Sequence, residues 1–149
     1  MKKVTITRAF EAPVERVWEI VGNPGVSPGP GIDVQVERVG SADGTGLVRI
    51  VKAGVGTAHE EITGVGPGPT LQYRLIKGAP VRDYTGVVTL GETPEGGTLV
   101  SWEAEFRPLV PGTGWAISLA TKHTLNRVLD AIAQRSGAAE GSAEGRAHG

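Results

Sequence analysis

Residues 112–134, which read GTGWAISLATKHTLNRVLDAIAQ, decide the fold of this chain. Large apolar residues recur in the second half of this stretch at the spacing of a helix, so that one side forms an apolar stripe. The stripe consists of Leu125, Val128, Leu129 and Ile132. Gly112 or Thr113 is a suitable N-cap for such a helix, and Arg135 and Gly137 indicate where it ends. The stretch predicts a long helix that needs a partner to cover its stripe.

The same side of this helix changes character toward its start. Before Leu125 it carries the small or hydroxyl-bearing residues Thr121, Ser118 and Gly114, with Ile117 beside them. Small groups under a long helix leave space in which a small molecule can bind. The alternative is that bulky side chains from a neighbouring strand fill this space, and the sequence alone leaves both interpretations open.

The composition excludes several classes of protein. A chain of 149 residues with a net charge of −1 fits one domain and gives no electrostatic reason to expect a nucleic acid or an anionic membrane as partner. The absence of cysteine excludes disulfides and suits a reducing cytoplasm. No apolar run is long enough for membrane insertion. We therefore expect a cytoplasmic protein that is a monomer or a homodimer.

The sequence offers no metal or cofactor motif. Of its three histidines, His59 points outward by strand parity, His123 lies opposite the apolar stripe, and His148 is in the tail. A metal needs ligands that converge, and these do not. No glycine-rich segment is followed by Lys-Ser or Lys-Thr at the start of a helix, as a phosphate-binding loop requires. We expect neither a metal nor another cofactor.

The chain before the long helix reads as strands with one short helix. Residues 3–10 alternate between apolar and polar in a first strand. Pro13 opens the short helix, which ends at Gly22. Its buried stripe consists of Val14, Val17, Trp18 and Val21. The Gly/Pro-rich residues 22–31 predict an irregular loop, either a surface connector or part of a cavity rim. Six strands follow, over 32–39, 47–52, 57–65, 71–77, 84–90 and 100–107.

This order of elements predicts an α+β domain. A sheet with one polar side must cover its other side, and the final helix is the only predicted element long enough to do so. The sheet should therefore curve around that helix. We expect one domain over residues 1–136. A disordered tail is expected over 137–149, because this segment is rich in Gly, Ala and Glu and lacks large apolar residues.

Four segments resemble a known superfamily. They are APVERVW at 12–18, GLVR at 46–49, GAPVRDY at 78–84 and GGTLVSW at 96–102. Together they are similar to helix-grip proteins of the START-like, polyketide cyclase/dehydrase and lipid-transport superfamily, also called SRPBCC. The resemblance implies a helix-grip fold, in which a curved seven-stranded antiparallel sheet wraps a long C-terminal helix and leaves a ligand cavity between them. Relatives often carry an aromatic residue where this chain has its loop 22–31.

Strand alternation puts the carboxylate of Glu60 on the inner side of the sheet, with Ala58 and Ile62. An inward carboxylate is costly without a partner. Arg49 on the preceding strand is one candidate, although that strand is equally apolar on both sides, and Arg8 is another. The resemblance favours an inward pair of Arg49 and Glu60. The pair would bind a polar group on an apolar ligand or transfer a proton on it; the alternative is a structural ion pair.

Further side chains are candidates for contact with the ligand. They are Tyr73, Tyr84, Trp102, Trp115, Ser118 and Thr121. The two tyrosines suit a cavity best, since a buried hydroxyl needs a polar partner. Packing in the core is the alternative role for each inward aromatic residue, and above all for Trp18. Trp115, which opens the long helix, is either a gate residue or a cap on the core.

Three functions fit these features. The first is a binding protein for a small hydrophobic molecule, such as a lipid or an aromatic, polyketide-like compound. The second is an enzyme of the polyketide cyclase or dehydratase type, which would use Glu60 and Arg49 for proton transfer. The third is a stress-response or interaction protein that does not use its cavity. The sequence favours the first of these.

Overall fold

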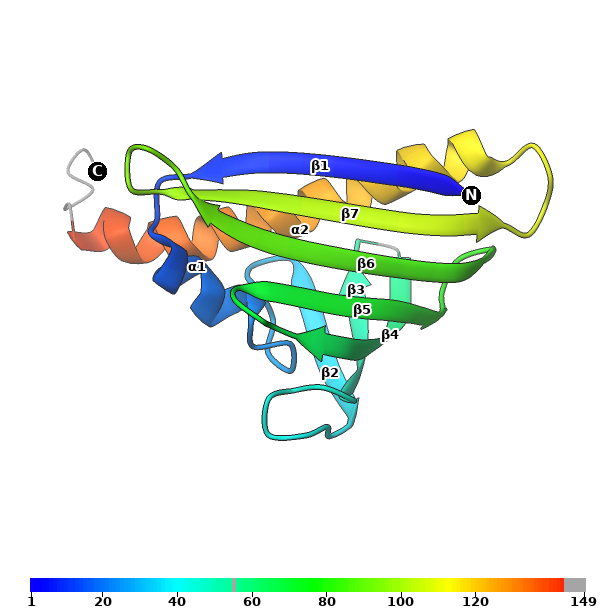
Figure 1. Ribbon diagram of the computed structural model, residues 1–149, viewed down its shortest axis with the longest axis horizontal. Coiled ribbons are helices and arrows are strands. Elements are labelled where there is room, and N and C mark those ends of the chain that lie inside the picture. The colour runs from blue at the N-terminus through cyan, green and yellow to red at the C-terminus, as the bar shows by residue number, and fades with distance from the viewer. Residues whose placement is uncertain (55, 144–149) are drawn as a thin grey trace.

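The computed structural model describes residues 1–54 and 56–143, with side chains through Gly137. Seven strands and two helices follow one another along the chain (Figure 1). They are β1 (Lys2–Phe10), α1 (Val14–Val21), β2 (Ile32–Arg38), β3 (Val48–Ala53), β4 (Gly56–Val65), β5 (Thr70–Lys77), β6 (Val81–Glu92), β7 (Thr98–Pro108) and α2 (Gly114–Ala143). Each predicted strand and helix is present.

The strands form one antiparallel sheet in the order β1-β7-β6-β5-β4-β3-β2. Neighbours in the sheet are neighbours in sequence except for β1, which pairs with β7. The chain must therefore travel from one edge of the sheet to the other between β1 and β2, and α1 and the loop 22–31 make this crossing (Figure 1). The sheet curves around α2, so the predicted helix-grip fold is confirmed.

The core lies between the inner face of the sheet, which is the face covered by α2, and the apolar stripe of that helix. Leu125, Leu129 and Ile132 are buried, as the helical spacing predicted, while Val128 is partly buried. On the sheet, Phe106 and Ile62 are fully buried. Burial of each large apolar side chain contributes about 1.5–3 kcal/mol, which makes this contact the main source of stability.

The two ends of α2 differ in how well the sequence predicted them. At the start, the carbonyl of Thr113 accepts hydrogen bonds from the amides of Ala116 and Ile117, both at 3.1 Å, so Thr113 is the N-cap residue as predicted. At the other end α2 extends to Ala143, past the stop predicted at Arg135 and Gly137. One glycine costs a helix only about 1 kcal/mol, and good helix formers follow it. Residues 144–149 of the expected disordered tail lie outside the described residues.

The short helix α1 ends where Gly22 caps it, its amide bonding to the carbonyl of Trp18 at 2.8 Å. Val17, Ile20 and Val21 are its buried residues. Trp18, predicted as core, is partly buried and packs against the core cluster. Its ring lies over Gly22, where a larger side chain would collide with it. No helix in residues 1–54 or 56–143 has the length and apolar character needed to span a membrane.

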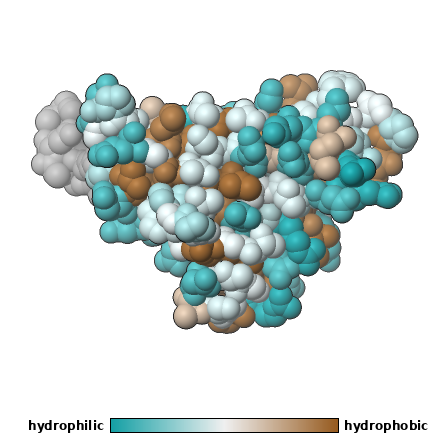
Figure 2. Space-filling view, viewed as in Figure 1, coloured by the Kyte–Doolittle hydropathy of each residue, from teal (hydrophilic) through white to brown (hydrophobic). Residues whose placement is uncertain are grey.

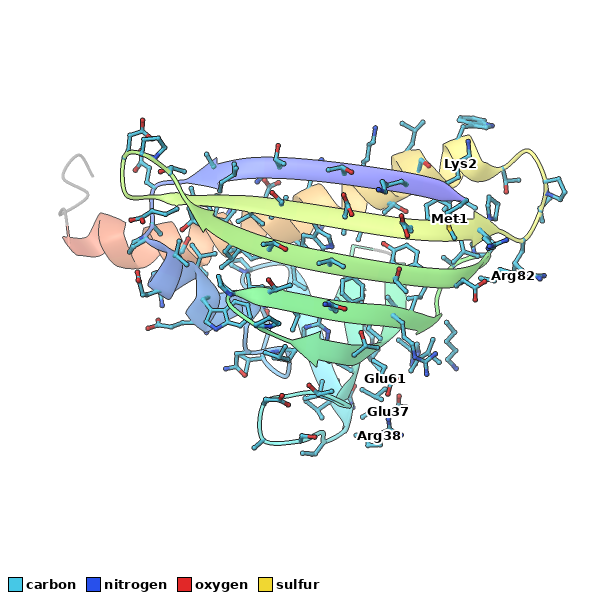
Figure 3. The ribbon with its side chains drawn as sticks, viewed as in Figure 1. Met1, Lys2, Glu37, Arg38, Glu61 and Arg82 are labelled. Carbon is cyan, nitrogen blue, oxygen red and sulfur yellow. The ribbon has the colours of Figure 1, made fainter. Side chains whose placement is uncertain are left out.

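The outer face of the sheet is largely polar, with separate hydrophobic patches (Figure 2). Glu61 lies on this face and accepts a hydrogen bond from Arg74 at 2.7 Å, with Arg38 at 3.4 Å from its other oxygen. Glu37, Arg38 and Glu61 gather at one margin of the molecule (Figure 3). Exposed ion pairs contribute only about 0–1 kcal/mol each, so these pairs add little to the stability of the fold.

Gly86 is the inward residue of β6 that lies opposite Tyr73 of β5. The ring of Tyr73 covers Gly86 so closely that a Cβ atom at this position would overlap it. The absence of a side chain at Gly86 therefore makes room for the Tyr73 ring.

We predict that Gly86→Ala lowers the free energy of unfolding by about 1–3 kcal/mol, because the Tyr73 ring must leave its buried position. Urea unfolding monitored by circular dichroism measures the change. Gly91→Ala in the same strand is the matched control, since nothing lies within 4 Å of a Cβ there. Equal stability of the two variants would contradict this account.

Candidate functional site

Arg49 and Glu60 form an ion pair on the inner face of the sheet. They are directly opposite each other in the pairing of β3 with β4. The Nε and Nη2 atoms of Arg49 donate to Oε1 of Glu60 at 3.1 and 2.9 Å, and each side chain is only 13% exposed. The strand register thus settles the parity that the sequence left open. Arg8, the other candidate partner, instead donates to Asp130 and Asn126 of α2.

Arg49 also holds the loop 22–31. Its Nη1 atom donates to the carbonyl oxygen of Pro24 at 2.9 Å. From the opposite side, Arg135 of α2 donates to the carbonyl of Ser27. The loop contains turns and no helix, and two arginines from different elements fix its backbone in place. The inner ion pair and the loop are therefore parts of one hydrogen-bonded unit.

Aromatic side chains continue the inner face beyond the ion pair. The indole of Trp102 donates to the hydroxyl of Tyr73 at 3.0 Å, and the two rings meet edge to face with centroids 6.4 Å apart. Tyr84 lies 6.4 Å from Tyr73 and stacks on Phe106 at 5.9 Å. Such pairs contribute about 0.5–1.5 kcal/mol each beyond the area they bury. The cluster gives the site two hydroxyls in an apolar setting.

Both tyrosine hydroxyls are held in their neutral form. Burial raises the pKa of Tyr73 well above its usual value, and the neighbouring Tyr84 and the charge of Glu60 act in the same direction. Burial also raises the pKa of Tyr84 to about 12, again with a contribution from the charge of Glu60. At neutral pH these groups are hydrogen-bond donors and acceptors rather than bases.

A pocket of about 40 Å³ lies between the sheet, α1, α2 and the loop 22–31. Its polar lining comes from Arg49, Tyr73 and Trp102. The apolar lining consists of Ile20, Val21, Val26, Pro28, Leu71, Val88, Val128 and Ile132. In this measure one water molecule needs about 10–15 Å³, so the pocket has room for only a few water molecules in this conformation.

The pocket lies under the second half of α2, whereas the sequence predicted space beneath Ser118 and Thr121. Those two residues face the sheet and are partly buried, but neither lines the pocket. The sheet is less completely covered at the end where the first half of α2 lies over it. Inward residues there keep partial exposure, namely Ala58, Glu60, Leu75, Tyr84 and Ile117. Inward residues at the other end are buried, namely Val88, Leu90, Val100, Leu129 and Ile132.

Trp115 does not join the site. It is 67% exposed in the first turn of α2, on the same side of the helix as the exposed Leu119. Since the helix turns about 100° per residue, Gly114 faces the sheet and the next residue points away from it. The prediction of Trp115 as a cap on the core is therefore wrong, and its role as a gate residue stays a prediction.

The sequence missed Val26 and Pro28 as lining residues. They belong to a segment without periodicity, so no pattern indicated which side chains turn inward. The one available signal was the expectation that the loop forms part of a cavity rim, which these two residues satisfy.

Within residues 1–54 and 56–143, no group of three or more His, Asp or Glu is placed to hold a metal ion.

Comparison with known proteins assigns the chain to a family. The family model described as "Polyketide cyclase / dehydrase and lipid transport" matches residues 1–137. The chain belongs to this family. No curated protein matches the sequence. The family match spans the whole sheet, α1, α2 as far as Gly137, and every residue of the candidate site.

Solved structures share the fold of this family member. XoxI from Bacillus cereus is 20% identical, with a TM-score of 0.76 over 94% of this chain and 99% of that one. A START superfamily protein from Mycobacterium smegmatis is 15% identical, with a TM-score of 0.73 over 91% and 97%. A point mutant of norcoclaurine synthase from Thalictrum flavum is 17% identical, with a TM-score of 0.73 over 93% and 96%. At these identities the likeness concerns the fold alone.

The two tyrosines of the chain, Tyr73 and Tyr84, both lie in the site, so their ionisation can be read without interference from other tyrosines. We predict that the folded protein forms little tyrosinate near pH 10, whereas the protein unfolded in guanidinium is half ionised there. Ultraviolet absorbance during a pH titration measures this difference. Half-ionisation of the folded protein near pH 10 would contradict the burial of the two hydroxyls.

The same shift makes stability depend on pH. Because the folded pKa of Tyr84 lies above the unfolded value of about 10, the unfolded state releases its proton first, and the free energy of unfolding falls as pH rises from about 10 toward 12. Tyr84→Phe should reduce this slope, which urea unfolding at several pH values measures.

Proposed function

We propose that this protein binds a small, largely apolar molecule between the sheet and α2, with a polar group of that molecule at Arg49, Glu60 and the tyrosines. The observation that carries this proposal is the position of the ion pair. Arg49 lines a pocket whose other walls are mostly apolar, and the charge of its partner carboxylate acts on the hydroxyls of Tyr73 and Tyr84. An apolar cavity with a few convergent polar groups is the usual form of a small-molecule site.

A purely structural ion pair accounts less well for this arrangement. Replacing a buried ion pair by apolar residues of similar volume is often neutral or stabilising, so stability alone gives little reason to place charges here. Both bonds from Arg49 reach the same oxygen of Glu60. Within the described part of the chain, no hydrogen bond reaches its other oxygen, Oε2, which remains free to meet a ligand.

The pocket must enlarge to admit a ligand. Small-molecule sites usually measure about 300–1,000 Å³, well above the 40 Å³ of this conformation. The loop 22–31 is the cover most easily displaced, since it lacks helix and strand and is held over the pocket by the bonds of Arg49 and Arg135. A norcoclaurine synthase with this fold has been solved with dopamine and hydroxybenzaldehyde, which supports aromatic ligands of modest size.

We predict that native mass spectrometry of freshly purified protein shows a bound small molecule that is lost on denaturation. Val88→Phe should abolish this species, because Val88 is a buried lining residue and the larger ring fills the pocket. Val87→Phe is the matched control, since the neighbouring side chain points to the outer face. Retention of the ligand by Val88→Phe would place binding elsewhere.

A second candidate is an enzyme of the cyclase or dehydratase type. The free Oε2 of Glu60 favours it, because a general base needs an oxygen that is not already committed to a hydrogen bond. The description of the family names a cyclase or dehydrase activity beside lipid transport. Under this proposal Glu60 takes the proton, Arg49 holds the carboxylate in place, and the tyrosine hydroxyls donate to the developing oxyanion.

If the second candidate is correct, Glu60→Gln abolishes conversion of the bound molecule, because an amide cannot accept the proton, while binding persists. Incubating the molecule identified by native mass spectrometry with each protein, and following loss of water by chromatography, tests this. Conversion that continues at the same rate in Glu60→Gln would exclude Glu60 as the base.

A further inference from the structure

The polar wall of the site carries no net charge. Arg49 and Glu60 are bonded to each other and mostly buried, so each side chain neutralises the other where a ligand would meet them. The hydroxyls of Tyr73 and Tyr84 are neutral. Arg49 is the charged member of the described pocket lining, and its charge is already balanced.

Arg8 and Arg135 make their hydrogen bonds outside the described lining of the pocket. Arg8 bonds to Asp130 at 2.6 Å and to Asn126 at 2.8 Å, where β1 faces α2. Arg135 donates to the backbone of the loop and lies outside the described lining. An anionic group that bound at Arg49 would therefore meet an arginine already paired with Glu60, with no further cation in the described lining to balance it. Burying an unbalanced charge is strongly unfavourable.

The contacts of Arg49 in this structure show which kind of group can bind beside the ion pair. The third bond of Arg49 goes to the carbonyl oxygen of Pro24, which is a neutral acceptor. A ligand that displaces the loop must replace this bond, and a carbonyl or hydroxyl oxygen does so without adding a charge. The two tyrosine hydroxyls are suited to the same kind of group.

We propose that the site selects uncharged ligands that carry a carbonyl or hydroxyl group over ligands with a carboxylate, and that Glu60 determines this selection by neutralising Arg49. This inference rests on the proposed binding function. It assigns Glu60 a role in specificity that is separate from any proton transfer. Removing the negative charge at position 60 should expose Arg49 as an anion site.

Two probes of equal ring size test the selection: 2-naphthol, which is neutral at neutral pH, and 2-naphthoate, which is ionised. Isothermal titration calorimetry measures both dissociation constants. We expect the wild-type protein to bind 2-naphthol at least about tenfold more tightly, a difference of about 1.4 kcal/mol. In Glu60→Gln the preference should reverse, because the amide oxygen still accepts from Arg49 while the arginine charge is no longer balanced.

Two control variants isolate the cause. Glu61→Gln removes a carboxylate from the outer face of the same strand and should leave the wild-type preference unchanged (Figure 3). The double variant Arg49→Gln/Glu60→Gln removes both charges and should again prefer 2-naphthol, which shows that the reversal in Glu60→Gln requires Arg49. Circular dichroism of each variant confirms that it is folded.

Each result decides a different point. Equal or tighter binding of 2-naphthoate by the wild-type protein would overturn the inference and leave the binding function standing. A wild-type preference for 2-naphthol that persists in Glu60→Gln would overturn the role assigned to Glu60. Binding of neither probe by any of the folded proteins would count against the proposed function itself, and with it the inference.

Discussion

The structure depends on one geometric constraint, which is that a single helix must cover the inner face of a seven-stranded sheet. Seven strands about 4.8 Å apart span about 29 Å, whereas a helix with its side chains is about 10–12 Å wide. Curvature brings the strands around α2 but does not close the gap completely. The remaining inner face is covered by α1 and the loop 22–31, which the connection from β1 to β2 carries across the sheet. The pocket lies where this cover changes from helix to loop.

Polar side chains on the covered face of the sheet are held in place because few hydrogen-bond partners are within their reach. A buried group that loses water must find a partner in the protein, and Arg49 finds partners on β4 and in the loop. Its side chain thereby connects β3, β4 and the loop 22–31. Tyr73 and Trp102 satisfy each other in the same way. The consequence is that the site and its cover are not independent: a group that competes for Arg49 also loosens the loop.

The sequence predicted which residues face inward wherever strands and helices have a regular apolar pattern. It did not settle features that depend on how the strands pair or on the course of the loop. Alternation alone placed Glu60, Tyr73 and Tyr84 inside, and helical spacing identified the stripe of α2 that is buried against the sheet. The inward position of Arg49 needed the pairing of β3 with β4, because its strand is apolar on both sides. The position of the pocket depends on the loop 22–31, which has no repeating pattern. The expected space beneath the start of α2 stays a prediction, and the partial exposure of the inward residues at that end agrees with it.

Affinity at this site is a difference between two terms of opposite sign. Filling the pocket removes apolar ligand surface from water, at about 25 cal/mol per Å². Opening the loop breaks the bonds that Arg49 and Arg135 make to its backbone, and each such charge-assisted bond is worth about 1.5–3 kcal/mol. A ligand without a hydrogen-bond acceptor incurs the full cost of breaking these bonds. One that places a neutral oxygen near the position vacated by the Pro24 carbonyl recovers part of it at Arg49. Under the proposed function, the bond between Arg49 and the loop thus favours those apolar molecules that can take over the role of the Pro24 carbonyl.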